Sequence, residues 1–183
     1  MRERRTGGTM DRNNSWRDID DETGGLHIRD ELTGVYNRAF YAAEVERVGK
    51  GRHFPVSVIM VSVDGFEEIS ARWGCDSGDQ VLRSVARLLT SVFRVEDIVA
   101  RVKRDTFVAL LPATDLDGAS SAVERLRQHL SDDPICMEGD RVGLSVGMAT
   151  EAVQGRLEKM VQAAEARLGE DQAARRRSFL ARG

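Results

Sequence analysis

The residues best suited to bind a ligand lie in two short polar segments. Ser62 and Asp64 stand at the end of a nearly continuous apolar run, Phe54–Asp64, which is typical of a central strand buried on both faces. Open α/β sheets bind ligands at the carboxyl ends of such strands. The second segment, Lys103–Thr106, places two cations and a carboxylate between two apolar runs. These side chains are the first candidates for chemistry.

The second segment is predicted to be the tip of a β-hairpin. Ile98–Val102 and Phe107–Leu111 have strand character and flank it. Tight two-residue hairpin turns need positive φ and favour Gly, Asn or Asp, but the tip begins with Lys103 and Arg104 and contains no glycine. Either the turn is of a looser type, or a glycine-rich site has been rebuilt with bulky side chains.

The composition is that of an ordinary globular domain. Of 183 residues, 41% are hydrophobic and 31% are charged, which suits one domain with its own core. The net charge of −3 gives no general field for nucleic acid or a membrane, and no apolar run approaches the ~18 residues of a membrane span. Cys75 and Cys136 lack metal-ligand spacing. We expect reduced thiols, a cytoplasmic location, and neither nucleic acid nor membrane as a partner.

The remaining pattern predicts helices packed against a largely antiparallel sheet, an α+β arrangement. Residues 1–25 are expected to be a disordered leader or linker, 26–177 the domain, and 178–183 a C-terminal tail. Further strands are expected over Ile135–Met137 and Val142–Ala149. Helices are expected from an N-cap at Asn37 to about Val48, over Glu67–Trp73, from Asp76–Asp79 to about Val92, over Asp115–Leu130, and from Leu157 to about Ala174.

Five segments resemble, in order and spacing, the GGDEF domain of bacterial diguanylate cyclases. They are DELTGVYNR, VSVDGFEEIS, GDQVLRSVARLL, RVEDIVARVKRDTFVALLP and GLSVGMAT, within roughly residues 29 to 177. The resemblance implies a ferredoxin-like core related to nucleotide cyclases, with one GTP and two divalent metals per domain. Two such domains meet to form cyclic di-GMP by metal-assisted phosphoryl transfer.

The family signature, GG(D/E)EF, falls on the predicted hairpin tip and is altered here. Its two glycines, which let the backbone approach the phosphates, fall on Lys103 and Arg104. The third position, a metal ligand in the family, keeps a carboxylate as Asp105. The fourth position, acidic in the family, is Thr106, and Phe107 matches the closing Phe.

Other active-site positions implied by the resemblance are partly lost. The family's first metal-binding Asp falls on Ser62, its guanine-reading Asn on Ser70, and a phosphate-contacting Lys on Gln172. The second Asp of the metal motif, the guanine-reading Asp and an Arg one turn beyond that Lys are retained as Asp64, Asp79 and Arg176. A serine hydroxyl is a much weaker Mg²⁺ ligand than a carboxylate. We therefore expect no catalysis and no resident metal, with Mg²⁺ relevant only to residual GTP binding.

A second ligand site of the family is retained. The segment Arg94–Asp97 matches the RxxD inhibitory site at the correct interval before the hairpin tip, and a further family arginine falls on Arg125. In that site the Arg reads a guanine edge and a phosphate of cyclic di-GMP, and the Asp accepts from guanine N–H groups. An RxxD also occurs by chance, and Arg94 and Asp97 also fit a helix-terminal cation beside a surface carboxylate. Arg125 would then pair with Glu124 or Asp132 in solvent.

These features predict an inactive GGDEF domain that binds cyclic di-GMP through Arg94, Asp97 and Arg125. Such a domain would relay the signal to an unidentified protein partner. Because cyclic di-GMP often binds such sites as a stacked dimer that bridges two domains, a ligand-linked homodimer is a further expectation. The alternatives are a protein interaction module that binds no nucleotide, a residual diguanylate cyclase, and a domain that binds GTP without turnover.

Overall fold

The structure of the protein is a computed structural model, which describes residues 27–51 and 54–180. The leader predicted for residues 1–25 and the last residues of the predicted tail, 181–183, lie outside the described residues. Within the described ranges, no helix is both long and apolar enough to cross a membrane.

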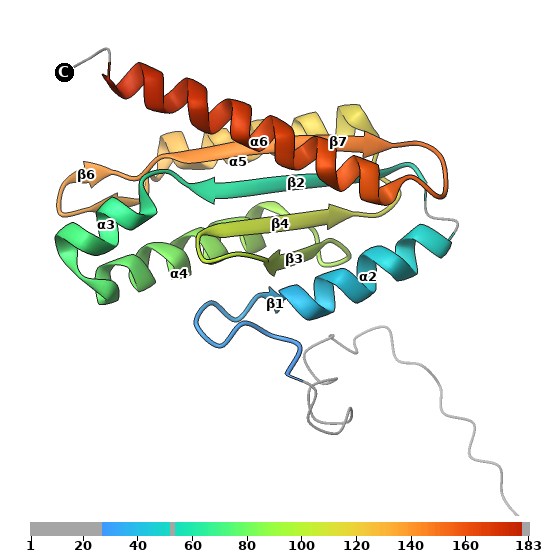
Figure 1. The fold of residues 1–183 in the computed structure, drawn as a ribbon, viewed down its shortest axis with the longest axis horizontal. Coiled ribbons are helices and arrows are strands. Elements are labelled where there is room, and N and C mark those ends of the chain that lie inside the picture. The colour runs from blue at the N-terminus through green and yellow to red at the C-terminus, as the bar shows by residue number, and fades with distance from the viewer. Residues whose placement is uncertain (1–26, 52–53, 181–183) are drawn as a thin grey trace, which may run out of the picture.

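Five strands form one sheet in the order β1-β3-β4-β2-β7 (Figure 1). The central strand, β2 (Val56–Val63), pairs antiparallel with β4 (Thr106–Leu111) on one side and β7 (Leu144–Glu151) on the other. β4 also pairs antiparallel with β3 (Ile98–Arg101), which confirms the predicted hairpin. β1 (Tyr36–Asn37) adds to β3 as the one parallel pair of this sheet.

Helices cover both faces of the sheet (Figure 1). α2 (Arg38–Lys50) and α6 (Leu157–Leu180) lie on one face, and α4 (Cys75–Val92) and α5 (Leu116–Asp132) lie on the other. The short α3 (Phe66–Trp73) follows β2 and packs against α4. The unit β2-α4-β3-β4-α5-β7, with β2 and β4 in the middle of the sheet, is the predicted ferredoxin-like α+β core.

The burial of β2 explains its continuous apolar sequence. Every residue of the strand is buried, as the sequence predicts. Because strand side chains alternate between faces, Val58 and Met60 join the core under α2 and α6, whereas Ile59 and Val61 join the core under α4 and α5. Ser62 and Asp64 lie at the carboxyl end of this strand, and the candidate site begins there.

Most of the predicted elements are present, with a few differences in their bounds. Asn37 caps α2 by accepting a hydrogen bond from the Phe40 N–H at 2.9 Å, as predicted. α6 continues to Leu180, beyond the predicted end near Ala174. β5 (Cys136–Met137) pairs with β6 (Asp140–Arg141) in a separate two-stranded sheet. The two-residue strands β1 and β6 were not predicted, because two residues are too few to show an alternating pattern.

Candidate functional site

The hairpin tip is a wide loop rather than a tight turn. The last β3–β4 pair joins Arg101 to Phe107, and the backbone N–H groups of Val102 and Lys103 both donate to the Thr106 carbonyl, at 2.9 and 3.2 Å. Among the described non-glycine residues, positive φ occurs at Ala113 and Glu138 and not at the tip. The turn is therefore of a looser type, and the turn itself does not require glycine.

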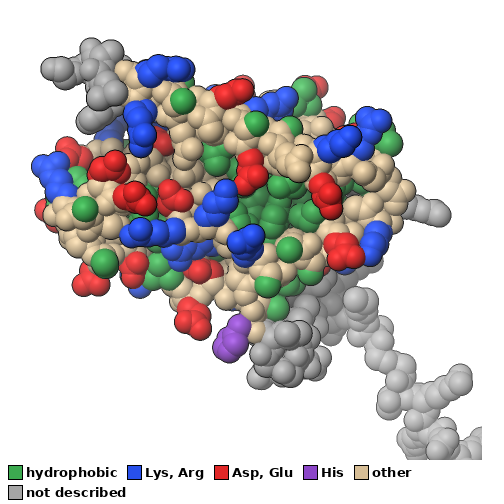
Figure 2. Space-filling model, viewed as in Figure 1, with side chains coloured by type: hydrophobic (Ala, Val, Ile, Leu, Met, Phe, Trp, Pro, Cys, Tyr) green, Lys and Arg blue, Asp and Glu red, His purple; other side chains and the backbone are tan. Residues whose placement is uncertain are grey.

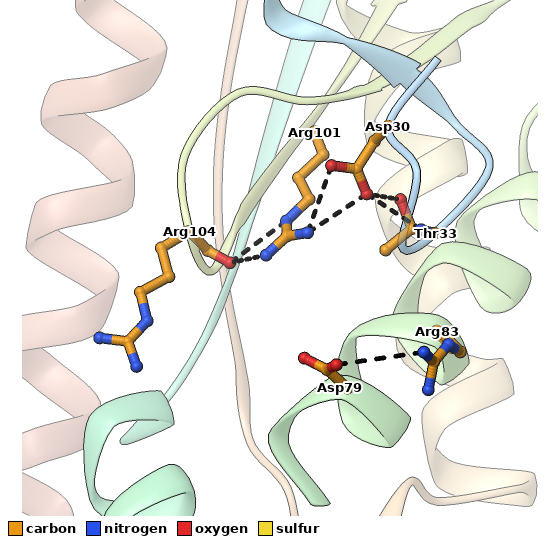
Figure 3. A network of polar contacts seen from close by, with 6 residues as sticks. All are labelled: Asp30, Thr33, Asp79, Arg83, Arg101 and Arg104. Carbon is orange, nitrogen blue, oxygen red and sulfur yellow. Dashed lines mark hydrogen bonds and ion pairs between the residues drawn. The ribbon is translucent and has the colours of Figure 1, made fainter. Parts of the chain in front are cut away.

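Arg101 holds the tip in place (Figure 3). Its Nε and Nη2 donate to the Arg104 carbonyl at 3.2 and 2.6 Å, and its Nη1 lies 3.2 Å from Asp30 Oδ1. Burial raises the pKa of Asp30, but hydrogen bonds from Thr33 and the charge of Arg101 outweigh this effect and hold that pKa below its usual value. This mostly buried ion pair ties the hairpin to the loop before β1. The sequence analysis missed Arg101, although a lone charge in an apolar strand run indicates a buried partner.

The two cations at the tip lie beside different acidic residues, one on α6 and one on α3. Lys103 Nζ donates to Glu165 of α6 at 2.9 Å. The Arg104 side chain extends away from Arg101 (Figure 3), lies 5.3 Å from the centre of the Phe66 ring and approaches Glu67 to 3.9 Å. Figure 2 shows the same mixing of Lys and Arg with Asp and Glu across this face of the molecule. The tip cations therefore belong to local ion pairs and not to a broad basic field.

Four of the predicted site residues meet at the carboxyl end of β2. Ser62 Oγ accepts a hydrogen bond from Gln172 Nε2 of α6 at 3.0 Å and donates to Asp105 Oδ2 at 3.5 Å. The Thr106 hydroxyl donates to Asp105 Oδ1 at 3.0 Å. Side chains from a strand, a hairpin and a distant helix thus form one hydrogen-bonded group.

Asp64 lies beside this group with partners of its own. The Ser145 hydroxyl donates to Asp64 Oδ1 at 2.6 Å, and Arg175 Nε lies 3.9 Å from Asp64 Oδ2. Burial raises the pKa of Asp64, and the Ser145 hydrogen bond and the Arg175 charge offset this only in part. Ser145 and Arg175 were not predicted as site residues. Their contacts with Asp64 depend on how β2, β7 and α6 pack together, which the sequence does not show.

The remaining positions of the implied active site lie apart from this group. Ser70 of α3 faces α4, where a Cβ on Gly78 would lie 2.7 Å from Ser70 Oγ. Asp79 lies 4.0 Å from Arg83 on the same helix (Figure 3). Arg176 is exposed. It is its neighbour Arg175, not Arg176, that reaches Asp64.

The RxxD segment forms a compact turn between α4 and β3. Asp97 Oδ2 accepts a hydrogen bond from the Arg94 N–H at 2.8 Å, and the Asp97 N–H donates to the Arg94 carbonyl at 3.1 Å. The Arg94 guanidinium is exposed, 4.0 Å from Glu96. Arg125 Nη2 donates to the Val92 carbonyl, at the end of α4, at 3.3 Å.

The charges of Arg94 and Arg125 both act on the Asp97 carboxylate. Burial raises the pKa of Asp97, and Glu96 adds to the rise. The hydrogen bond from the Arg94 N–H and the charges of Arg94 and Arg125 act in the opposite direction. A half-buried carboxylate thus lies within the field of two guanidinium groups. The structure places Arg125 at the end of α4 rather than beside Asp132, which accepts from Gln128 instead.

The RxxD turn and the hairpin tip are separate sites. The turn precedes β3 and the tip follows it, so they lie at opposite ends of that strand. A groove of about 410 Å³ runs between α4 and the end of α5. Its lining includes Arg87, Ser91 and His129, and none of Arg94, Asp97 and Arg125.

Comparisons with known proteins agree on the identity of this fold. The family model described as "Diguanylate cyclase, GGDEF domain" matches residues 27–178. The response regulator PleD of Caulobacter vibrioides is 33% identical over 137 residues, which are 71% of this chain and 30% of PleD. The chain thus spans about a third of the length of such curated relatives.

Solved structures give the same result. The crystal structure of the diguanylate cyclase SiaD in complex with its activator SiaC, from Pseudomonas aeruginosa, has a TM-score of 0.75 at 29% identity, over 86% of this chain and 63% of that one. The coiled coil and GGDEF domain of DgcB from Caulobacter crescentus, solved with c-di-GMP, has a TM-score of 0.74 at 21% identity, over 80% of this chain and 81% of that one. The second likeness shows the fold alone.

Proposed function

Because the chain belongs to the GGDEF domain family, we propose that it is a cyclic di-GMP receptor that makes no cyclic di-GMP itself. The ligand binds at Arg94, Asp97 and Arg125, and the domain passes the signal to a protein partner. The observation that supports this proposal is the RxxD turn, in which the Arg94 N–H holds the Asp97 carboxylate, the Arg94 guanidinium is exposed, and Arg125 binds the end of α4.

The chemistry of the RxxD turn suits this ligand. The hydrogen bond from the Arg94 N–H fixes the Asp97 carboxylate and leaves further oxygen lone pairs for the N–H groups of a guanine. The exposed Arg94 fork can bind a phosphate or a guanine edge in a bidentate manner. A ligand with guanine bases and two anionic phosphates would gain from both features.

The proposed loss of cyclase activity rests on the residues at the opposite end of β3. The two glycine positions of the signature carry Lys103 and Arg104, and both side chains already have acidic neighbours. One metal-binding position is the hydroxyl of Ser62, which is engaged by Gln172 and Asp105. A hydroxyl in place of a carboxylate weakens any hold on Mg²⁺.

Partners are part of the same proposal. SiaD was solved in complex with its activator SiaC, and at 29% identity this likeness supports a protein partner of similar kind for the present chain. Stacked cyclic di-GMP between two RxxD turns would produce a ligand-linked homodimer. Light scattering with and without ligand distinguishes this from a monomeric receptor.

A thermal-shift screen with a parallel turnover assay tests the proposal. We expect cyclic di-GMP to raise the Tm, because a ligand that binds the folded state stabilises it by mass action. We expect no cyclic di-GMP to form from GTP and Mg²⁺. A Tm that no guanine nucleotide changes would favour a protein interaction module, and product that disappears in Asp105→Ala would restore a residual cyclase.

Asp97→Asn is expected to stabilise the protein while it weakens ligand binding. Since the folded pKa of Asp97 is raised, its protonation favours folding. That contribution is present below the unfolded pKa and is lost as pH rises through the folded pKa. At neutral pH the ionised carboxylate therefore costs stability, and the neutral amide, which still accepts the Arg94 N–H, should raise the Tm.

Cyclic di-GMP binding to the Asp97→Asn variant should fall by about 10-fold or more, because a charged acceptor is lost. Calorimetry should also show that wild-type binding weakens as pH falls through the raised pKa of Asp97. Asp140→Asn, the same change at an exposed carboxylate of β6 outside the RxxD turn, is the matched control and should have little effect. Unchanged affinity in Asp97→Asn would remove Asp97 from the site.

A further inference from the structure

We infer that the carboxyl end of β2 has become a metal-independent joint, in which the chain's own side chains occupy the place of the divalent ions that the family implies. We call this group the β2 joint. It consists of Ser62, Asp64, Asp105, Thr106, Ser145, Gln172 and Arg175. The inference concerns the former active site and does not depend on cyclic di-GMP binding at the RxxD turn.

The donor set of the β2 joint does not fit a pair of Mg²⁺ ions. Mg²⁺ requires near-octahedral oxygen ligands at about 2.0–2.1 Å, with one or two carboxylates among them. Both oxygens of Asp105 already accept hydroxyl hydrogen bonds, from Ser62 and Thr106.

A cation of the chain itself lies beside the second carboxylate. Arg175 Nε is 3.9 Å from Asp64 Oδ2 and 3.3 Å from Asp171 Oδ2. The other side of Asp64 is closed by backbone, because a Cβ on Gly143 would lie 2.6 Å from Asp64 Oδ2. A divalent ion at Asp64 would therefore meet a positive guanidinium on one side and the backbone of Gly143 on the other. Arg175 supplies the countercharge that a metal would otherwise give.

The buried hydroxyls of the joint form one row across the sheet. Thr106 of β4 and Ser145 of β7 both pair with Ser62 of β2 in the strand register. These three are buried, and of the described chain only Ser57 is also a buried polar residue. Buried polar groups must be hydrogen-bonded, and each hydroxyl of the row has a partner within the joint. The network is complete without a metal.

The joint fastens α6 to the sheet and to the hairpin. The Gln172 amide of α6 donates a hydrogen bond to Ser62 of β2. Two turns earlier on the same helix, Glu165 accepts a hydrogen bond from Lys103 of the hairpin tip. α6, β2 and the hairpin are the elements that a nucleotide with its metals would bridge in the family. Here side chains bridge them directly, so their arrangement should not respond to metal or GTP.

Metal titrations on the whole chain test this inference without a catalytic assay. Mn²⁺, followed by electron paramagnetic resonance, and Mg²⁺, followed by thermal unfolding, are the probes. We expect no bound Mn²⁺ at millimolar concentration in the wild type, and the same Tm in Mg²⁺ and in EDTA. A rise of the wild-type Tm with Mg²⁺, or stoichiometric Mn²⁺ binding, would overturn the inference.

Two variants complete the test. Ser62→Asp places a second carboxylate beside Asp105 and should bind Mn²⁺ at least about 10-fold more tightly than the wild type does. Gln172→Ala should lower the Tm by about 2–4 °C, equally with Mg²⁺ and with EDTA. Gln128→Ala is its control, because the Gln128 amide donates to the exposed Asp132 carboxylate one turn further along α5. If Gln172→Ala and Gln128→Ala unfolded at the same temperature, the joint would have no structural role.

Discussion

Arg94→Ala is expected to weaken cyclic di-GMP binding by about 100-fold or more. Loss of a bidentate guanidinium removes two charge-assisted hydrogen bonds, each worth roughly 1.5–3 kcal/mol. A 100-fold change corresponds to about 2.7 kcal/mol. Calorimetric titration of wild type and variant measures it. The Tm of the free protein should not change, because the Arg94 side chain is 68% exposed and its ion pair with Glu96 is long, at 4.0 Å.

The control for this variant is Arg127→Ala. Arg127 is also an exposed arginine, on α5 two residues from Arg125, and its loss changes the net charge by the same amount. It should leave affinity within about 2-fold of wild type. Equal weakening in both variants would show that general charge, and not the RxxD turn, governs binding. Unchanged affinity in Arg94→Ala would contradict the proposed site.

Gly147→Ala is expected to have the largest effect on stability. Gly147 of β7 lies directly under α6, where a Cβ would overlap the Ala164 carbonyl oxygen and the Leu168 nitrogen and would lie 2.8 Å from Leu168 Cα. These are backbone atoms of a helix and cannot move aside singly, so α6 must shift as a whole. We expect a loss of about 3 kcal/mol, which lowers the Tm by about 6–12 °C. Thermal unfolding measures this change.

Gly169→Ala is the matched control on α6. A Cβ at Gly169 meets nothing within 4 Å, and alanine is favoured over glycine in a helix by about 1 kcal/mol. The control should therefore keep or raise the Tm. Because α6 also carries Gln172 and Arg175, Gly147→Ala should loosen the β2 joint as well. A Gly147→Ala variant as stable as the wild type would mean that α6 does not lie on β7 as described.

The sequence was sufficient to predict those parts of the fold that have a strong local pattern. The continuous apolar run of β2 predicts a strand buried on both faces, and two apolar runs around Lys103–Thr106 predict a hairpin. The end of α6 was less certain, because no strong stop signal follows Ala174 and the helix continues to Leu180. β1 has only two residues, and it forms because its backbone pairs with the edge of β3. That pairing depends on tertiary structure alone.

The candidate site was predicted residue by residue, but its contacts were not. Which hydroxyls face Ser62 depends on the register of β4 and β7, which a single sequence does not specify. The choice of Arg175 over Arg176 as neighbour of Asp64 depends on the rotation of α6 about its axis. The wide hairpin loop likewise follows from the two hydrogen bonds to the Thr106 carbonyl, which no residue type in the loop indicates.

The most direct test of the receptor proposal is to locate bound cyclic di-GMP by amide chemical-shift mapping of the isotopically labelled protein. The proposal predicts that the largest changes fall on the Arg94–Asp97 turn and around Arg125, with little change at Ser62, Asp64 and the hairpin tip. Largest changes at the β2 joint and the tip would place the ligand in the former active site. That result, or no change at saturating ligand, would contradict the proposal.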